Sequence, residues 1–170
     1  MFSEFFLKEK GSYDARIAII LDCLRFDVWN QISIDIMKQI GEEIFWRTKC
    51  GFSILPSTTE FSRKSLFSGK YPKDINQQDD LTNFSALIKD FARSEDIKLV
   101  KNCELEKNKE KIQGALHSNS KFNVFIYNYI DIIGENLDLN SILDIIPILI
   151  EKIKSLLQEI FPIYNTPLIY

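Results

Sequence analysis

Cysteine is scarce in this sequence, and the spacing of the cysteines does not suggest cross-linking. The three cysteines, Cys23, Cys50 and Cys103, are odd in number, lie far apart and form no CxxC pair. This pattern argues against a disulfide framework and against a structural zinc knuckle. Isolated cysteines are typical of small buried side chains in a reducing compartment, so we expect buried thiols.

Long apolar runs are also missing. No uninterrupted run reaches the roughly 20 residues that a membrane helix needs, and the richest stretch, residues 142–150, is interrupted by Asp144 and Pro147. The first residues, MFSEFFLKEK, carry charges where the apolar core of a signal peptide would lie. We therefore expect a cytoplasmic protein with no membrane partner.

Glycine and proline are few, at six and five in 170 residues, whereas phenylalanine occurs 13 times. With 45% hydrophobic residues, the chain has the composition of one globular domain with a core of its own. Glycine-rich phosphate loops and a serine-hydrolase elbow are both absent. The net charge of −3 excludes a global basic field for nucleic acid, although it leaves a nucleotide substrate open.

Apolar periodicity alternates between strand and helix patterns along the chain. The nearly continuous apolar run from Arg16 to Asp22 predicts a strand that is buried on both faces. Three- and four-residue spacings predict amphipathic helices, and an α/β fold with a mostly parallel sheet flanked by helices follows. The further strands are predicted at 49–55, 97–100, 121–130 and from 167, and the helices at 26–40, 57–67, 81–93 and 139–161, the last kinked or broken at Pro147. Residues 102–121 are expected to form a frayed helix and a loop.

The turn from Ser57 to Glu60 has the Ser-x-x-Glu pattern of a capping box. This pattern predicts Ser57 as the N-cap and places Thr59 in the first helical turn, where backbone N–H groups are unpaired. A hydroxyl there is suited to attack a phosphoryl group, because the amides stabilise developing negative charge. An ordinary helix start with solvent-facing threonines is the alternative.

Two carboxylates follow predicted strands directly, Asp22 after the first and Asp131 after the strand at 121–130. The carboxyl ends of parallel strands meet at one edge of a sheet, so these groups and the 57–60 turn should converge there. Oxygen donors in such a cluster can hold a divalent cation, although an aspartate in this position also commonly caps a helix. Arg25 and Arg63 lie near these motifs and are candidates to bind phosphate oxygens, or are ordinary surface arginines.

Three segments, taken together and in this order, resemble the PglZ domain of the alkaline phosphatase superfamily. They are residues 19–27 (IILDCLRFD) with Trp29, residues 55–63 (LPSTTEFSR) followed by 65–72 (SLFSGKYP), and residues 125–135 (FIYNYIDIIGE). The resemblance implies an alkaline-phosphatase-like core with two divalent cations, zinc or manganese, beside a threonine nucleophile. It assigns Asp22 and Thr59 to one metal site and Asp131 to the other. Glu135 stands where the superfamily often has histidine, which favours manganese or magnesium.

The resemblance also implies an incomplete ligand set, because the family's later Asp-His pair and histidine would follow Tyr170. We therefore expect the N-terminal part of a PglZ domain, in which a homodimer would supply the missing ligands. Relatives of this type imply a phosphodiesterase or phosphatase acting on a nucleotide or oligonucleotide, with partner proteins of a phage-defence or two-component signalling system. The alternative is a non-catalytic PglZ-like interaction module within a larger assembly.

Overall fold

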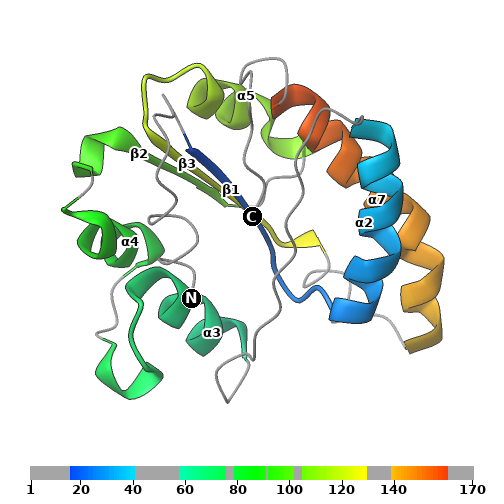
Figure 1. Cartoon of the computed structure of the whole chain (residues 1–170), viewed down its shortest axis with the longest axis horizontal. Helices are drawn as coiled ribbons and strands as arrows, with labels where there is room; N and C mark the ends of the chain where they lie inside the picture. Colours follow the sequence, from blue (N-terminus) through cyan, green and yellow to red (C-terminus); the bar gives the residue numbers. More distant parts are fainter. Residues whose placement is uncertain are drawn as a thin grey trace.

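Three short runs of β-branched and aromatic residues form a parallel sheet. The computed structural model describes residues 16–40, 58–75, 79–90, 92–101, 105–129 and 139–160. Its strands are β1 (Arg16–Leu21), β2 (Ile97–Lys101) and β3 (Phe122–Tyr127), in the order β1-β3-β2 (Figure 1). Every residue of β3 is buried, as expected for the middle strand of a parallel sheet covered on both faces. The predicted α/β fold with a parallel sheet is thereby confirmed.

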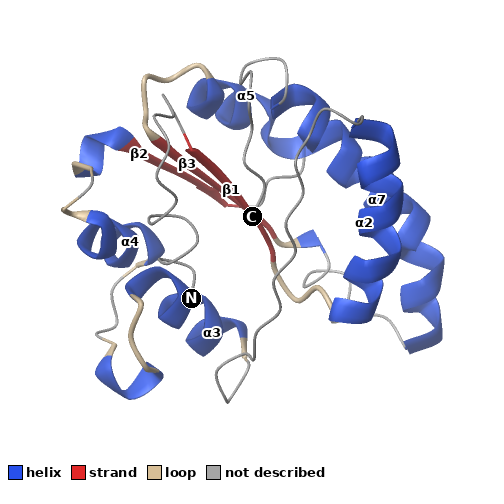
Figure 2. Cartoon of the chain, in the orientation of Figure 1, coloured by secondary structure: helices blue, strands red, loops and turns tan. Residues whose placement is uncertain are grey.

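Helices cover both faces of the sheet (Figures 1 and 2). On one face lie α2 (Phe26–Ile40), α5 (Leu105–Leu116) and α7 (Leu139–Ile160), which pack aliphatic side chains against Ile17, Ile19 and Phe125. On the other face lie α3 (Thr59–Ser68) and α4 (Asp80–Ile88), whose Phe67 and Phe84 pack over Ala18, Val124 and Ile126. Successive strand residues point to opposite faces, so each strand contributes to both cores.

Helix α2 has the bounds that its apolar spacing predicts, and α7 continues through Pro147 as one helix. Helix α4, predicted over 81–93, ends at Ile88 instead. The backbone of Arg93 is extended, and its N–H and side chain bond the Asp96 carboxylate, starting a separate 3-10 turn at Ser94–Asp96. This local capping box competes with continuation of the helix.

Residues 105–116 form a more regular helix than the frayed one expected from their polarity. Ile112, Ala115 and Leu116 of α5 are buried on the sheet, and the irregularity is confined to a non-helical backbone at Asn108. Burial of this apolar edge against β2 and α7 compensates for weak local propensity. In β3, sheet pairing ends at Tyr127 rather than at the predicted residue 130.

Several predictions lie outside the described residues. These are the strands at 49–55 and from 167, the side chain of Ser57, and the candidate ligands Asp131 and Glu135. Thr59 is described as the first residue of α3, whereas its side chain is not. Within the described ranges, no helix is long and apolar enough to cross a membrane.

Candidate functional site

Asp22 lies at the carboxyl end of β1, where the sheet predicts a ligand-binding edge. Its backbone N–H donates to the Tyr127 carbonyl at 3.0 Å, which ties this residue to the end of the central strand. The Asp22 side chain is only 12% exposed. The next residue, Cys23, has a left-handed backbone with φ of 61°, a conformation that is uncommon for a side chain with a Cβ.

The Cys23 side chain does not meet the expectation of a buried thiol. It is exposed and not in a disulfide, and its Sγ lies 4.0 Å from Asp22 Oδ1. The cause is its position, since the turn after β1 lies beyond the paired part of the sheet and outside both hydrophobic cores. Cys50 and Cys103 fall outside the described residues.

Helix α3 begins one residue later than its sequence pattern predicts. Thr58, with φ of −68° and ψ of 145°, is the N-cap, and its carbonyl accepts the first helical hydrogen bond from Ser62 N–H at 2.9 Å. The extended backbone of Thr58 is what shifts the start away from Ser57. Thr59 is still in the first turn, where N–H groups lack helical acceptors and the helix dipole is positive.

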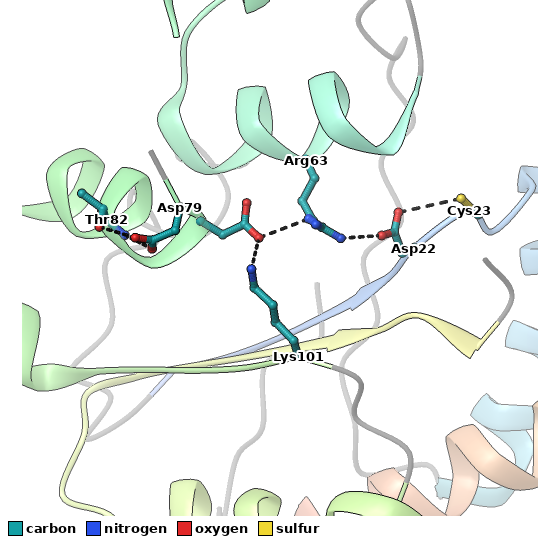
Figure 3. A network of polar contacts seen from close by, with 7 residues as sticks. Asp22, Cys23, Arg63, Asp79, Thr82 and Lys101 are labelled. Carbon is teal, nitrogen blue, oxygen red and sulfur yellow. Dashed lines mark hydrogen bonds and ion pairs between the residues drawn. The ribbon is translucent and has the colours of Figure 1, made fainter. Parts of the chain in front are cut away.

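Arg63, one turn after Thr59, joins α3 to the end of β1. Its Nη1 donates to Asp22 Oδ2 at 3.0 Å, and its Nε lies 3.2 Å from Asp80 Oδ2 (Figure 3). The guanidinium is therefore held between two carboxylates, with a side chain that is 22% exposed. This contact brings the predicted nucleophile helix and the predicted metal aspartate to the same place. The role of Arg63 in binding phosphate stays a prediction.

Asp80 is a charged residue of this site that sequence reasoning missed. Its side chain is 4% exposed, and its Oδ2 also lies 2.8 Å from Lys101 Nζ at the end of β2. The distances fit ion pairs, but the angles at Arg63 Nε and Asp80 Oδ2 do not meet the criteria for hydrogen bonds. We therefore regard both contacts of Asp80 as electrostatic. A buried carboxylate is expensive unless it is paired, and here two cations approach one oxygen.

The position of Asp80 follows from a local capping pattern. Asp79 is the N-cap of α4, and its Oδ1 accepts from the Thr82 backbone N–H at 2.9 Å. That hydrogen bond is the main cause of the lowered pKa of the Asp79 carboxyl. Asp80 is then the first residue of the helix, where the dipole favours negative charge. The Asp-x-x-Thr pattern at 79–82 could have placed the start of α4, but no local signal reveals that Asp80 meets Arg63 and Lys101.

Arg25, the second predicted phosphate ligand, pairs with a neighbour in sequence. Its Nη2 lies 2.7 Å from Asp27 Oδ2, and the two side chains are 56% and 61% exposed. The hydrogen bond from Arg25 is the main cause of the lowered pKa of Asp27. The structure thus brings Arg63 to Asp22 and shows Arg25 in a solvent-exposed pair at the start of α2.

The described residues supply one candidate ligand of the implied metal site. Asp22 is suitable, because a largely buried carboxylate at the sheet edge is an oxygen donor for a hard or borderline cation. Among the residues that the structure describes, no group of three His, Cys, Asp or Glu side chains is arranged to hold a metal ion. The other implied ligands are the Thr59 hydroxyl, Asp131 and Glu135, which lie outside the description.

A comparison with models of protein families identifies the family of this chain. The model of the BREX system PglZ alkaline phosphatase-like domain matches residues 7–166. The chain therefore belongs to the PglZ family, a phosphatase-like class, and the resemblance noted from three motifs is confirmed over most of the sequence. No curated protein matched the chain in a second comparison.

Proposed function

We propose that this PglZ domain is a metal-dependent phosphohydrolase module, with a nucleotide or oligonucleotide as its phosphomonoester or phosphodiester substrate. The observation that carries the proposal is the Arg63–Asp22 contact of 3.0 Å, together with the family match. It joins the first turns of α3, which carry Thr59, to the carboxylate that follows β1. A nucleophile, an oxygen ligand and a guanidinium are the components that phosphoryl transfer needs, and the contact supports the proposal by bringing the helix that begins at Thr59 to Asp22.

In the proposed reaction, Thr59 Oγ attacks phosphorus while the bond to the leaving oxygen breaks. The hydroxyl proton passes to solvent, the leaving group is protonated, and water then cleaves the phosphothreonine to restore the hydroxyl. The backbone N–H groups at the start of α3 stabilise the negative charge that develops on the phosphoryl oxygens. Asp22 and Thr59 would hold one divalent cation, and Asp131 and Glu135 a second; zinc or manganese there polarises phosphoryl oxygens when bound.

We assign Arg63 the role of binding a phosphoryl oxygen through the side of its guanidinium that faces neither carboxylate. Nη1 faces Asp22 and Nε faces Asp80, so Nη2 is the nitrogen that we assign to the substrate. Because the two carboxylates flank the guanidinium, it approaches the substrate in a fixed orientation. Arg25 is assigned a lesser, peripheral role, since it is exposed and hydrogen-bonded to Asp27 at the start of α2.

The cellular setting that we propose is a bacterial phage-defence assembly in which the domain works with partner proteins. The support is the family description, which refers to the BREX system. A two-component signalling system is the alternative setting.

Turnover of a chromogenic phosphodiester and the corresponding monoester tests the activity, with manganese, zinc or no added metal. Thr59→Ala should lower metal-dependent turnover by about a thousandfold or more, because it removes the nucleophile. Thr58→Ala is the matched control: this neighbouring threonine is exposed and its side chain makes no cap hydrogen bond. It should retain activity within about threefold, since surface changes of this kind have small effects.

Equal activity of Thr59→Ala and the unchanged protein would contradict the assignment of the nucleophile. Absence of turnover in folded protein, with every metal, would favour the non-catalytic interaction module.

A further inference from the structure

Four charged side chains form a row across the candidate site. Asp22 directly follows β1, whereas Arg63, Asp80 and Lys101 lie on α3, α4 and β2, and the charges alternate in sign along the row (Figure 3). Asp22 and Arg63 are the residues that the proposed function uses. Asp80 and Lys101 form the other half of the row, and the proposed chemistry assigns them no role.

Asp80 is the most strongly constrained member of the row. Its side chain is 4% exposed and lies at the start of α4, whose first turn is fixed by the Asp79 cap. Helix α4 is in turn held against α3 by Phe67 and Phe84, whose rings meet edge to face with centroids 5.7 Å apart. The carboxylate of Asp80 therefore has little freedom of its own relative to α3.

Arg63 is the flexible member, because several rotatable bonds separate its guanidinium from α3. Asp22 and Asp80 contact different edges of the guanidinium, and two carboxylates restrict its rotation much more than one would. The second cation, Lys101, is 47% exposed and is placed to offset the remaining charge at Asp80 Oδ2. Asp80 thus anchors the guanidinium, and Lys101 makes burial of that anchor less unfavourable.

We propose that Asp80 is a positioning residue of this site: it holds the Arg63 guanidinium in place against Asp22, and Lys101 supports it. The functional consequence rests on the proposed phosphohydrolase activity, whereas the positioning itself does not. If Arg63 binds substrate from Nη2, then loss of Asp80 should raise KM more than it lowers kcat, since ordering of the guanidinium must then occur on binding.

The direct test is NMR of the arginine Nε–H groups in the whole chain. In the unchanged protein, the Arg63 Nε–H should show a high heteronuclear NOE and exchange with solvent about tenfold more slowly than that of Arg25, because the Arg63 Nε atom is buried whereas Arg25 donates to Asp27 in a solvent-exposed pair. Asp80→Asn keeps the shape of the side chain and removes its charge. We expect this variant to lower the Arg63 NOE to the value of Arg25 and to bring the two exchange rates within about twofold.

Asp27→Asn is the matched control, because it removes the carboxylate that pairs with the other arginine. It should change the Arg25 signal and leave that of Arg63 unaltered. An Arg63 signal that is equally ordered in folded Asp80→Asn overturns the proposal. If that variant does not fold, the unchanged protein still decides: an Arg63 Nε–H as mobile as that of Arg25 also overturns it.

Kinetics separate this inference from the proposed function. Loss of Arg63 order in Asp80→Asn, in a protein without phosphohydrolase activity, supports the positioning role and contradicts the function. Loss of order with unchanged KM and kcat also supports positioning and contradicts substrate binding by Arg63.

Discussion

The two faces of the sheet differ in what holds their helices. On the α2, α5 and α7 face, a continuous aliphatic core reaches from Ile17 to Leu157, and polar links such as Lys109–Glu159 lie towards solvent, with side chains 57% and 28% exposed. On the α3 and α4 face, the core is smaller and includes Phe67, Phe84 and Phe122. This face also carries the ion pair between the partly buried Arg63 and the buried Asp80.

This difference indicates that one face mainly stabilises the fold and the other carries the candidate site. Aliphatic packing stabilises a fold without specifying chemistry, whereas buried ion pairs contribute little net stability because desolvation offsets their attraction. Charges are nevertheless placed between α3, α4 and the sheet edge, so we infer that the smaller face carries the function. Substitutions on the two faces should accordingly differ in which property they change.

The largest expected effect on folding comes from the aliphatic face. Leu156 of α7 is fully buried, so Leu156→Ala should lower the free energy of unfolding by about 2–5 kcal/mol. The Arg63 NMR signal should stay unchanged in the folded variant, because Leu156 lies in the core of the opposite face. Chemical denaturation measures the first quantity.

Ile148→Ala on the same helix is the control, since Ile148 is 48% exposed and should change stability by no more than about 0.5 kcal/mol. Disordering of Arg63 by Leu156→Ala would break the proposed separation of the two faces.

Two glycines, one on each face, provide a second test, because replacing them by alanine should change stability in opposite directions. Gly69 ends α3 in the left-handed region, with φ of 67°, and a Cβ there would lie 3.0 Å from Leu87 Cδ1. Gly69→Ala should therefore destabilise the protein by about 1–2 kcal/mol. Gly114 lies within α5 with open space around it, so Gly114→Ala should stabilise by about 0.5–1 kcal/mol through helix propensity.

Denaturant midpoints of the two variants measure both effects. A Gly69→Ala variant as stable as the unchanged chain would show that the C-cap does not fix the connection from α3 to α4.

The smallest expected effects are on the stability of the protein at acidic pH. The pKa of Asp79 is lowered mainly by the Thr82 backbone N–H, and the pKa of Glu159 mainly by hydrogen bonds from Gln113 and Lys109. A carboxyl with a lowered folded pKa adds stability above its ordinary value, here 3.8 and 4.5, and this contribution is lost as pH falls through the folded value.

Stability measured from pH 7 downwards should therefore decline less steeply below these values in Asp79→Asn and in Glu159→Gln. The first substitution tests the site face and the second the aliphatic face. If stability declines with falling pH as steeply in a variant as in the unchanged protein, the hydrogen bonds of the replaced carboxyl group do not persist in solution.

Sequence patterns predicted the ends of a helix best where the residues of that helix alone determine them. The spacing of apolar residues is sufficient for both ends of α2, and the end of α3 at Ser68 lies one residue beyond the predicted residue 67. Predictions failed where two local signals compete, as at the end of α4, where the Arg93–Asp96 capping box stops the helix early. The N-cap of α3 was misplaced by one residue for a related reason, because Ser57 and Thr58 are both good caps.

The residues of the candidate site also differ in whether the sequence could predict them. Motifs in the sequence make Asp22 and Arg63 candidates for the site, since both lie within short recognisable segments. The sequence by itself also determined the alternation of strands and helices, because periodicity is a property of neighbouring residues. Only the tertiary structure decided that Arg63 meets Asp22 across 41 positions and that Asp80 and Lys101 complete the row. The physical reason is that ion pairs depend on distances between side chains, which are set by how the helices pack on the sheet.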